Sequence, residues 1–329
     1  MELTALKQSE VQVSAEDSRR MWELSVRAAA LPAASTPQLA DMLLDIPAGV
    51  RDPLVSFAEG TSHTGYLLLR GLEVGDLPPT PTGHDSHLLD GHGTSGAMAL
   101  FADLVGSLIG YQDEKDGALI HDVHPVRGEE TRIENSGSVA FDFHTENVHH
   151  PLRPDFLGLL CLRQDHDGVA ATRVASVREA ELLLTEEQRR VLRSPRFQSA
   201  YPTSFARNIP GPRPTAGPHP VLFGREGQSF MRFNSHNTTA ADAEGTAALE
   251  ALSAALETVC RDIVLDRGDL VLVDNHIAAH GRSSFTPRYD GADRWLRRCY
   301  SLRSTPRWAE HMMHGQRVVP ELAQISGVF

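Results

Sequence analysis

A histidine and a glutamate stand two positions apart, as His144 and Glu146, in the stretch F-D-F-H-T-E-N-V-H-H, residues 141–150. The segment otherwise reads as extended, and positions i and i+2 of a strand project to the same face. An imidazole and a carboxylate are both costly to bury unless something compensates them. A shared metal ion would do so. A hydrogen-bonded core pair is the alternative, because His-x-Glu is a short motif that also occurs by chance.

A third ligand for such an ion could come from D-R-G-D-L-V-L-V-D-N-H-I-A-A-H-G-R-S-S, residues 266–284. A turn leads into the apolar run 268–273, which predicts a buried strand. The strand runs out into a polar end that carries His276 and His280. Spacing alone does not choose between these two histidines.

An arginine that could bind an anion lies further on, in D-R-W-L-R-R-C-Y-S-L, residues 293–302. The segment alternates like a strand, so Arg294 and Arg298 share a face, and Arg297 points away and is expected to be solvated. Two histidines and one carboxylate that leave coordination positions open are the ligand set of non-haem Fe(II) oxygenases. A 2-oxo acid could occupy two open positions and dioxygen the third. Arg294 could then bind the distal carboxylate of that acid through two parallel hydrogen bonds.

The elements that must position these side chains are short strands flanked by helices. Residues 209–220, I-P-G-P-R-P-T-A-G-P-H-P, can be neither helix nor central strand, and they form either a flap or a plain connector. We expect one domain over 1–329, with N-terminal helices (about 1–60) packed on the core and a flap at about 202–222. The periodicity predicts helices at 14–31, 35–46, 97–109, 176–193 and 241–262, and buried strands at 65–71, 156–163 and 268–273.

The bulk properties exclude several function classes. The chain has 329 residues and a net charge of −12, which argues against a nucleic-acid surface and against an anionic membrane partner. It has three cysteines and no C-x-x-C motif, so a cysteine zinc site is not expected. The sequence shows no signal-peptide pattern and no apolar run of membrane-spanning length, and we expect a cytoplasmic protein.

Three separated segments resemble the clavaminate synthase group of Fe(II)/2-oxoglutarate-dependent oxygenases, which act on free amino acids. They occur in the same order as in that group, and the similarity runs over most of the chain from about residue 100. The segments are F-H-T-E-N-V-H-H-P-L-R-P-D-F-L-G-L-L-C-L-R (143–163), A-A-T-R-V-A-S-V-R (170–178) and D-N-H-I-A-A-H-G-R-S-S-F-T-P-R-Y-D-G-A-D-R-W-L-R-R (274–298).

The resemblance implies a mainly β fold, a double-stranded β-helix (jelly roll, cupin-like) with flanking α-helices. It implies Fe(II) as the metal, 2-oxoglutarate as co-substrate and O2 as oxidant. His276 is then expected to pack or to make a local hydrogen bond. By resemblance the iron ligands are His144, Glu146 and His280; the co-substrate residues are Arg294, Thr172 and Arg298; and the substrate contacts include Gln112 and Ser136, with Glu146 near the substrate amine.

The segment after F-M-R-F (230–233) departs from relatives that hydroxylate arginine. Those relatives carry aspartates there, whereas this chain has N-S-H-N, residues 234–237. Without a carboxylate, a cationic head group would be poorly compensated. Asn234 and His236 suit a neutral polar head group, so citrulline is favoured, with arginine, asparagine and lysine as further possibilities, although Asp242 or Glu244 could substitute for the missing aspartates.

The sequence therefore predicts hydroxylation at C3 or C4 of a free L-amino acid, in natural-product (antibiotic) biosynthesis. The expected partner is a small-molecule amino acid, with no nucleic acid and no membrane. Two alternatives use the same fold: a metal-dependent hydrolase, and a non-catalytic cupin-like binding protein. Arg294 and Thr172 have no obvious role in the hydrolase, and a binding protein would not need the intact ligand set.

Overall fold

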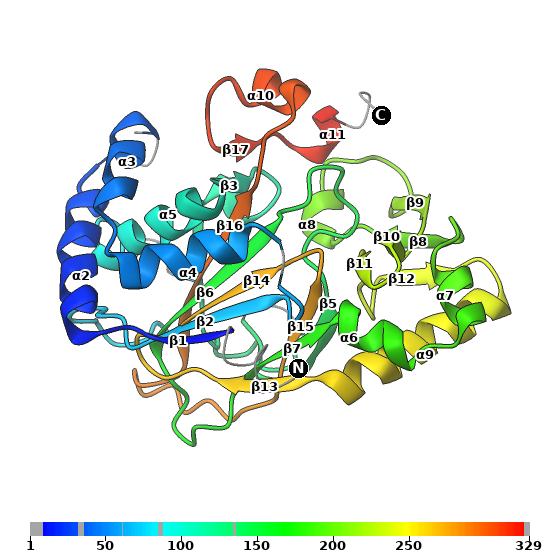
Figure 1. Cartoon of the computed structure of the whole chain (residues 1–329), viewed down its shortest axis with the longest axis horizontal. Coiled ribbons are helices and arrows are strands. Elements are labelled where there is room, and N and C mark those ends of the chain that lie inside the picture. The colour runs from blue at the N-terminus through cyan, green and yellow to red at the C-terminus, as the bar shows by residue number, and fades with distance from the viewer. Residues whose placement is uncertain (1–8, 32–35, 61, 85–87, 134–135, 326–329) are drawn as a thin grey trace.

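The fold is built on two β-sheets that face each other, with helices on their outer sides (Figure 1). The computed structural model describes residues 9–31, 36–60, 62–84, 88–133 and 136–325. The larger sheet has eight strands. In order they are β1 (Glu10–Gln12), β2 (Tyr66–Arg70), β14 (Leu270–Asp274), β6 (Phe156–Arg163), β16 (Trp295–Leu302), β3 (Ser107–Tyr111) and β17 (Val318–Val319), and β4 (Ile120–Val123) also pairs with β16.

The smaller sheet carries the chemistry-bearing segments. Its four strands lie in the order β13 (Arg261–Val264), β7 (Ala171–Ser176), β15 (Ala278–Arg282) and β5 (Phe141–His144). All the pairings in this sheet are antiparallel. The register of β15 places His280 opposite His144 on one side and Arg282 opposite Thr172 on the other.

Side chains that alternate between the two faces of each strand let the larger sheet contribute to two hydrophobic cores. In β2, Leu67 and Leu69 lie in the core under the N-terminal helices, whereas Tyr66 and Leu68 lie in the core between the two sheets. Side chains of a strand alternate between faces, so a sheet covered on both faces needs apolar residues at every position. This is why the continuous apolar run predicted at 65–71 forms an interior strand.

Helices cover the outer faces of both sheets (Figure 1). On the larger sheet they are α2 (Ala15–Ala29), α3 (Thr36–Met42), η1 (Leu43–Asp45), α4 (Ala48–Ala58) and α5 (Gly93–Val105). On the side of the smaller sheet they are α6 (Val177–Ala180), η3 (Glu181–Leu183), α7 (Glu186–Leu192) and α9 (Ala243–Val259). The predicted helix 14–31 is confirmed as α2, whose N-cap Ser14 accepts a hydrogen bond from the backbone N–H of Asp17.

Three helix predictions are wrong in their extent. The helix predicted at 241–262 ends at Val259, and β13 begins at Arg261. The helix predicted at 97–109 ends at Val105, and β3 follows directly and pairs with β16. A Cβ at Gly106 would lie 2.2 Å from the carbonyl oxygen of Leu302, so the close approach to β16 needs glycine there. The helix predicted at 176–193 is interrupted, because the chain is extended at Leu184 and Thr185 caps a new helix, α7.

The region 202–222 is only partly irregular. It contains α8 (Thr203–Ala206) and β9 (Thr215–His219), and β9 is the edge strand of a small sheet with the order β12 (Thr238–Ala240), β8 (Phe197–Ala200), β9. The prediction that 209–220 holds neither a helix nor a central strand is confirmed. The remaining elements are a hairpin of β10 (Leu222–Arg225) and β11 (Gln228–Met231), with η2 (Lys115–Gly117), α10 (Arg307–Met313) and α11 (Leu322–Ile325).

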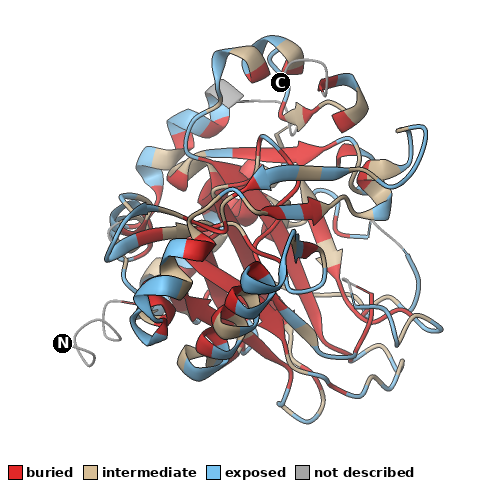
Figure 2. Ribbon diagram, turned by 90° about the vertical axis from the view of Figure 1, so that its right-hand side faces the viewer, coloured by how far each residue is buried: buried red, intermediate tan, exposed pale blue. Residues whose placement is uncertain are grey.

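Burial follows this layering: the central strands are largely buried, and the outer sides of the helices are exposed (Figure 2). Among the helices of the described residues, none is long and apolar enough to cross a membrane. The prediction that Arg297 is solvated is wrong, because this residue is only 2% exposed. It lies under α5, where it donates to Ser95 and pairs with Asp122, since the outer face of β16 is covered by a helix.

Candidate active site

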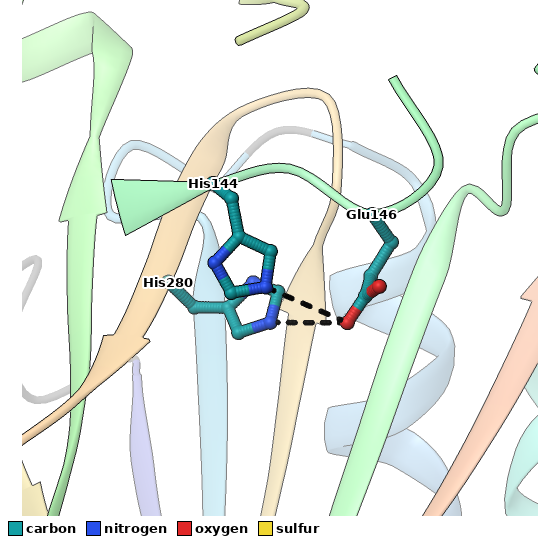
Figure 3. Close-up of side chains that lie close together, drawn as sticks. All are labelled: His144, Glu146 and His280. Carbon is teal, nitrogen blue, oxygen red and sulfur yellow. Dashed lines mark ion pairs between the residues drawn. The ribbon is translucent and has the colours of Figure 1, made fainter. Parts of the chain in front are cut away.

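His144, Glu146 and His280 converge between the two sheets (Figure 3). His144 ends β5, His280 lies opposite it on β15, and Glu146 follows β5 in a turn rather than in the strand as expected. Glu146 Oε1 lies 3.2 Å from His280 Nε2 and 3.9 Å from His144 Nε2. All three residues are buried, with exposures of 5–8%.

The protonation of this group suits metal binding. The Nδ1–H of His144 can donate to the carbonyl of Asp142 at 3.0 Å, which leaves Nε2 with its lone pair toward Glu146. Burial, then the charge of His280, lowers the pKa of His144 to about 3, so it is neutral at pH 7. Burial acts to raise the pKa of Glu146, but the hydrogen bond from His280 and the charge of Arg298 outweigh it and keep the carboxylate ionised.

These residues fit an Fe(II) ion. The donor set is two imidazole nitrogens and one carboxylate oxygen, all within 4.8 Å of one another. Donors bound at about 2.1 Å to one ion lie at most about 4.2 Å apart, and both imidazole–carboxylate distances meet this limit. His280 Nδ1 is buried without a hydrogen-bond partner in the described part of the chain, and the ring packs against that of His144 with ring centres 4.2 Å apart.

Arg294 and Thr172 form a second part of the site. Arg294 directly precedes β16, is 5% exposed, and its Nη2 donates to Thr172 Oγ1 at 3.4 Å. Among the described residues, no carboxylate pairs with its guanidinium, and burial lowers its pKa. A buried cation of this kind is suited to an anionic ligand.

Arg298 belongs to a different cluster on the inner face of β16. Its guanidinium donates to Glu114 Oε1 and to His121 Nδ1, and it lies 3.7 Å from Glu146 Oε1. The hydroxyl of Tyr300 lies 3.2 Å from Glu146 Oε2 and 3.4 Å from Glu114 Oε1. This cluster therefore places an arginine and a second carboxylate beside the candidate metal ligands.

One cavity joins the metal ligands to the arginines. It opens between the inner faces of the two sheets. Its apolar wall comes from Val123, Leu157, Leu159 and Leu296 of the larger sheet. Its polar lining comes from His144, Glu146, Thr172, His280, Arg282, Arg294 and Arg298.

Two of the predicted substrate residues lie away from this cavity. Gln112 is exposed just beyond the end of β3, where its amide oxygen lies near Gly117. Ser136 is 8% exposed, and its neighbour is the side chain of Glu129. A hydrogen bond from Ser136 lowers the pKa of Glu129 and helps to keep that carboxylate ionised. Neither residue lines the cavity, and each lies in a turn.

Two further predicted substrate residues, Asn234 and His236, lie close to β5. Asn234 forms a β-bridge with His144, and its Oδ1 accepts from the backbone N–H groups of His236 and Asn237. His236 is exposed at the rim, where its Nε2 lies 3.4 Å from Asp142. Asn234 thus lies beside the candidate metal ligand His144, although its side-chain amide oxygen already accepts hydrogen bonds within its own turn.

Three residues of the site were missed by the sequence reasoning: Glu114, Tyr300 and Arg282. Glu114 lies two positions after Gln112, and it accepts a hydrogen bond from Arg298. Tyr300 shares the alternation of Arg294 and Arg298 along β16, so the same periodicity could have found it. Arg282 lies two positions after His280 on β15 and could have been found in the same way.

Comparison with known proteins supports the same class of enzyme as the site. The model of the taurine catabolism dioxygenase TauD, TfdA family matches residues 62–300. The chain is 38% identical over 258 residues to an L-asparagine oxygenase of Streptomyces coelicolor, covering 78% of this chain and 76% of the relative. It is 35% identical over 258 residues to clavaminate synthase 2 of Streptomyces clavuligerus, covering 78% and 79%.

Solved structures extend the likeness to nearly the whole chain. An asparagine oxygenase in complex with Fe(II), 2S,3S-3-hydroxyasparagine and succinate superposes with a TM-score of 0.87 at 32% identity, covering 95% of this chain and 99% of that one. The non-haem iron oxygenase OrfP in complex with Fe and alpha-ketoglutaric acid superposes with a TM-score of 0.83 at 28% sequence identity. The match covers 94% of this chain and 99% of that one. The predicted class, an Fe(II)/2-oxoglutarate-dependent oxygenase, is confirmed. The chain belongs to the taurine catabolism dioxygenase TauD, TfdA family.

Proposed function

We propose that this chain hydroxylates C3 or C4 of a free L-amino acid whose side chain ends in a neutral polar group. The observation that carries the proposal is the cluster of Arg298 and Glu114 beside Glu146. A free amino acid is a zwitterion, so its receptor needs a cation for the carboxylate and an anion for the ammonium group. Arg298 supplies the first and Glu114 with Glu146 the second.

Glu114 has capacity left for such a substrate. Its Oε1 accepts from Arg298, whereas its Oε2 is buried without a hydrogen-bond partner in the described part of the chain. Burial raises the pKa of Glu114, and the charge of Arg298 opposes this. An ammonium group donating to Oε2 would remove an unsatisfied buried acceptor, which favours binding.

The metal and co-substrate roles follow from the donor chemistry. His144, Glu146 and His280 would hold Fe(II), and Arg294 with Thr172 would bind the distal carboxylate of 2-oxoglutarate. The bound iron and co-substrate supply the oxygen chemistry, and the protein's contribution is to position the substrate carbon and to exclude water. The apolar wall of Leu157, Leu159 and Leu296 supports the exclusion of water from the reacting centre.

The head group is the least constrained part of the substrate. The described residues 234–237 carry no carboxylate, and the nearest acid, Asp142, is exposed and lies 3.4 Å from His236. A ureido or amide group suits this surrounding better than a guanidinium. Citrulline remains our favoured substrate, with asparagine next, and relatives at 34–38% identity include an L-asparagine oxygenase and an enduracididine beta-hydroxylase.

Two structural assignments belong to this proposal. We propose that the two facing sheets are the halves of a double-stranded β-helix, and that residues 202–222 close over the site when substrate is bound. Phe205 of α8 supports the second assignment, because it packs on His149, only three positions beyond Glu146, at a ring distance of 4.5 Å. A role in natural-product biosynthesis is consistent with the named activities of several relatives.

A panel of free amino acids tests the proposal. The purified protein is incubated with iron, ascorbate and 2-oxoglutarate, and products are read as a mass gain of one oxygen together with succinate. We expect citrulline or asparagine to be hydroxylated and to stimulate succinate formation. Efficient hydroxylation of arginine with inert citrulline would contradict the head-group assignment, and metal-dependent hydrolysis without succinate would contradict the proposed reaction.

A further inference from the structure

A second buried arginine, Arg282, lines the same cavity as Arg294. It ends β15, two residues after His280, so both side chains project to the same face of the smaller sheet. The register places Arg282 opposite Thr172 of β7, whose hydroxyl accepts from Arg294. Thr172 therefore stands next to both guanidinium-bearing residues.

The two arginines also share an aromatic neighbour. The guanidinium carbon of Arg282 lies 5.7 Å from the ring centre of Phe285, and that of Arg294 lies 5.9 Å from it. Phe285 is 9% exposed. Each contact is a cation–π interaction, which stabilises a charged guanidinium weakly and leaves its N–H donors available.

Neither guanidinium has an anionic partner within the part of the chain that the structure describes. Arg282 makes one hydrogen bond there, from Nη2 to the carbonyl of Val139 at 2.9 Å, and its Nε is buried without a partner. Two like charges buried side by side are costly unless an anion lies between them.

We propose that Arg282 is a second guanidinium for the distal carboxylate of 2-oxoglutarate, beside Arg294 and Thr172. The inference rests on the proposed function, because it takes the same cavity as the co-substrate site. A carboxylate has two oxygens and about four acceptor positions, so two arginines can donate to one group. Along β15, Arg282 is about 6.8 Å from His280, because the two residues are two positions apart on one strand. A five-carbon 2-oxo dicarboxylate can bridge this separation.

This arrangement would set the choice of co-substrate. Two cations favour a 2-oxo acid with a distal carboxylate over one without it, because the unliganded pair keeps an uncompensated charge. The alternative is that Arg282 only holds the loop at Val139 in place. The two roles differ in one respect: only the first depends on whether the ligand carries a distal carboxylate.

The test compares two ligands on two arginine variants. The Fe(II)-loaded enzyme is titrated calorimetrically without oxygen, with 2-oxoglutarate and with 2-oxobutyrate, which lacks the distal carboxylate. Arg282→Gln should weaken 2-oxoglutarate binding by roughly ten- to a hundredfold, the range for a charge-assisted hydrogen bond, and should leave 2-oxobutyrate binding unchanged. Arg282→Lys keeps the charge, so its affinity for 2-oxoglutarate should lie between those of the wild type and Arg282→Gln. If the glutamine variant does not fold, the lysine variant is compared with the wild type instead.

Arg178 offers a matched control. It is also 8% exposed, donates to the backbone carbonyls of Gly60 and Ser62, and has a buried Nε without a partner in the described structure. It also lies over an aromatic ring, that of Phe230 at 5.6 Å, but it does not line the cavity. Arg178→Gln should leave the affinities for both ligands unchanged.

The outcomes separate the two hypotheses. Wild-type affinity of Arg282→Gln for 2-oxoglutarate, or equal losses for both ligands, would overturn the role of Arg282 and leave the proposed function standing. A wild-type protein that binds iron but not 2-oxoglutarate would overturn the proposed function itself.

Discussion

At the residue scale, the site separates into three groups with distinct electrostatic roles. The candidate metal ligands combine a neutral imidazole with an ionised carboxylate. Arg294 and Arg282 are cations without an anionic partner among the described residues. Arg298 and Glu114 are a compensated pair. Each group suits a different part of the ternary complex, so single substitutions should affect the binding of one component.

The metal ligands give the first prediction. His280→Ala removes one of three donors, and we expect Fe(II) affinity to fall by at least about a hundredfold, since even outer partners of metal ligands contribute about 10–100-fold. Equilibrium dialysis with Fe(II) under anaerobic conditions measures it. His84→Ala is the control, because His84 is exposed, pairs with Glu129 and does not line the cavity. Wild-type iron affinity in His280→Ala would rule out this histidine as a ligand.

Glu114 gives a second prediction. Glu114→Gln keeps the shape but removes the anion that we assign to the substrate ammonium group. The affinity for the amino acid should fall by about 1.5–3 kcal/mol, the range for a hydrogen bond to a charged group, with 2-oxoglutarate affinity unchanged. Calorimetry on the iron-loaded enzyme separates the two ligands. Equal weakening of both would instead mean that Glu114 acts by holding Arg298, its hydrogen-bond partner.

At the scale of elements, neighbouring strands bring the site together. β5 and β15 pair directly and carry the two histidines, and β16 of the facing sheet carries the arginine cluster. Positions on paired strands are held by the hydrogen-bond ladder and by packing on both faces. The segment 202–222 is held at β9 by pairing with β8, and at α8 by Phe205, which packs on side chains that follow β5.

The flap gives a third prediction at this scale. Phe205 is 2% exposed and packs on the rings of Tyr111, His149 and His150. Phe205→Ala would remove the main apolar contact of α8, and buried Phe→Ala changes cost about 3–5 kcal/mol. Amide hydrogen exchange across 202–222 should accelerate, and succinate should form in excess of hydroxylated product.

The hairpin of β10 and β11 supplies the control for the flap. Phe223 and Phe230 lie there, with ring centres 5.8 Å apart, and both are partly exposed. Phe223→Ala makes the same chemical change outside α8, so exchange in 202–222 and the coupling of succinate to product should match the wild type. Unchanged exchange in Phe205→Ala would show that this ring does not hold the segment.

At the scale of the whole molecule, buried histidines make stability depend on pH. Burial lowers the pKa of His121 and His150 to about 3, and that of His219 to about 4. The unfolded chain binds protons at these sites below about pH 6.5, whereas the folded chain stays neutral. The free energy of unfolding should therefore fall as pH decreases from 6.5 toward 4.

His219 makes this prediction specific. It is 6% exposed, and its Nε2 lies 3.0 Å from Ser199 Oγ. Between pH 7 and pH 5, the wild type should lose about 2 kcal/mol more unfolding free energy than His219→Gln, since each pKa unit is worth about 1.4 kcal/mol. Urea unfolding at the two pH values measures this. Parallel pH profiles for both proteins would contradict it.

The domain organisation gives a last prediction. We expect 1–329 to behave as one domain, because the core between the two sheets is formed by segments as distant as Leu68 and Tyr300. Urea unfolding followed by fluorescence and by circular dichroism should then give coincident single transitions. Two separated transitions would show that the helices before residue 60 fold independently of the sheets.

The residue sequence by itself determined the chemistry and many of the elements. The His-x-Glu spacing and the arginine before an alternating strand identified His144, Glu146 and Arg294, and the family resemblance selected His280 rather than His276; the structure brings these four side chains into one cavity. Apolar periodicity also identified β6, β14 and α2, because local pattern decides whether a segment is strand or helix.

Only the tertiary structure decided which polar side chains face that cavity. Gln112 is exposed, whereas Glu114 pairs with the cavity-lining Arg298, because a turn follows β3. Arg297 is buried because α5 covers its face of β16, which no local pattern reveals. Arg282 and Arg294, twelve positions apart in sequence, meet only because β7 places Thr172 next to both. Burial and side-chain pairing depend on contacts between distant segments, whereas periodicity reports only the local backbone.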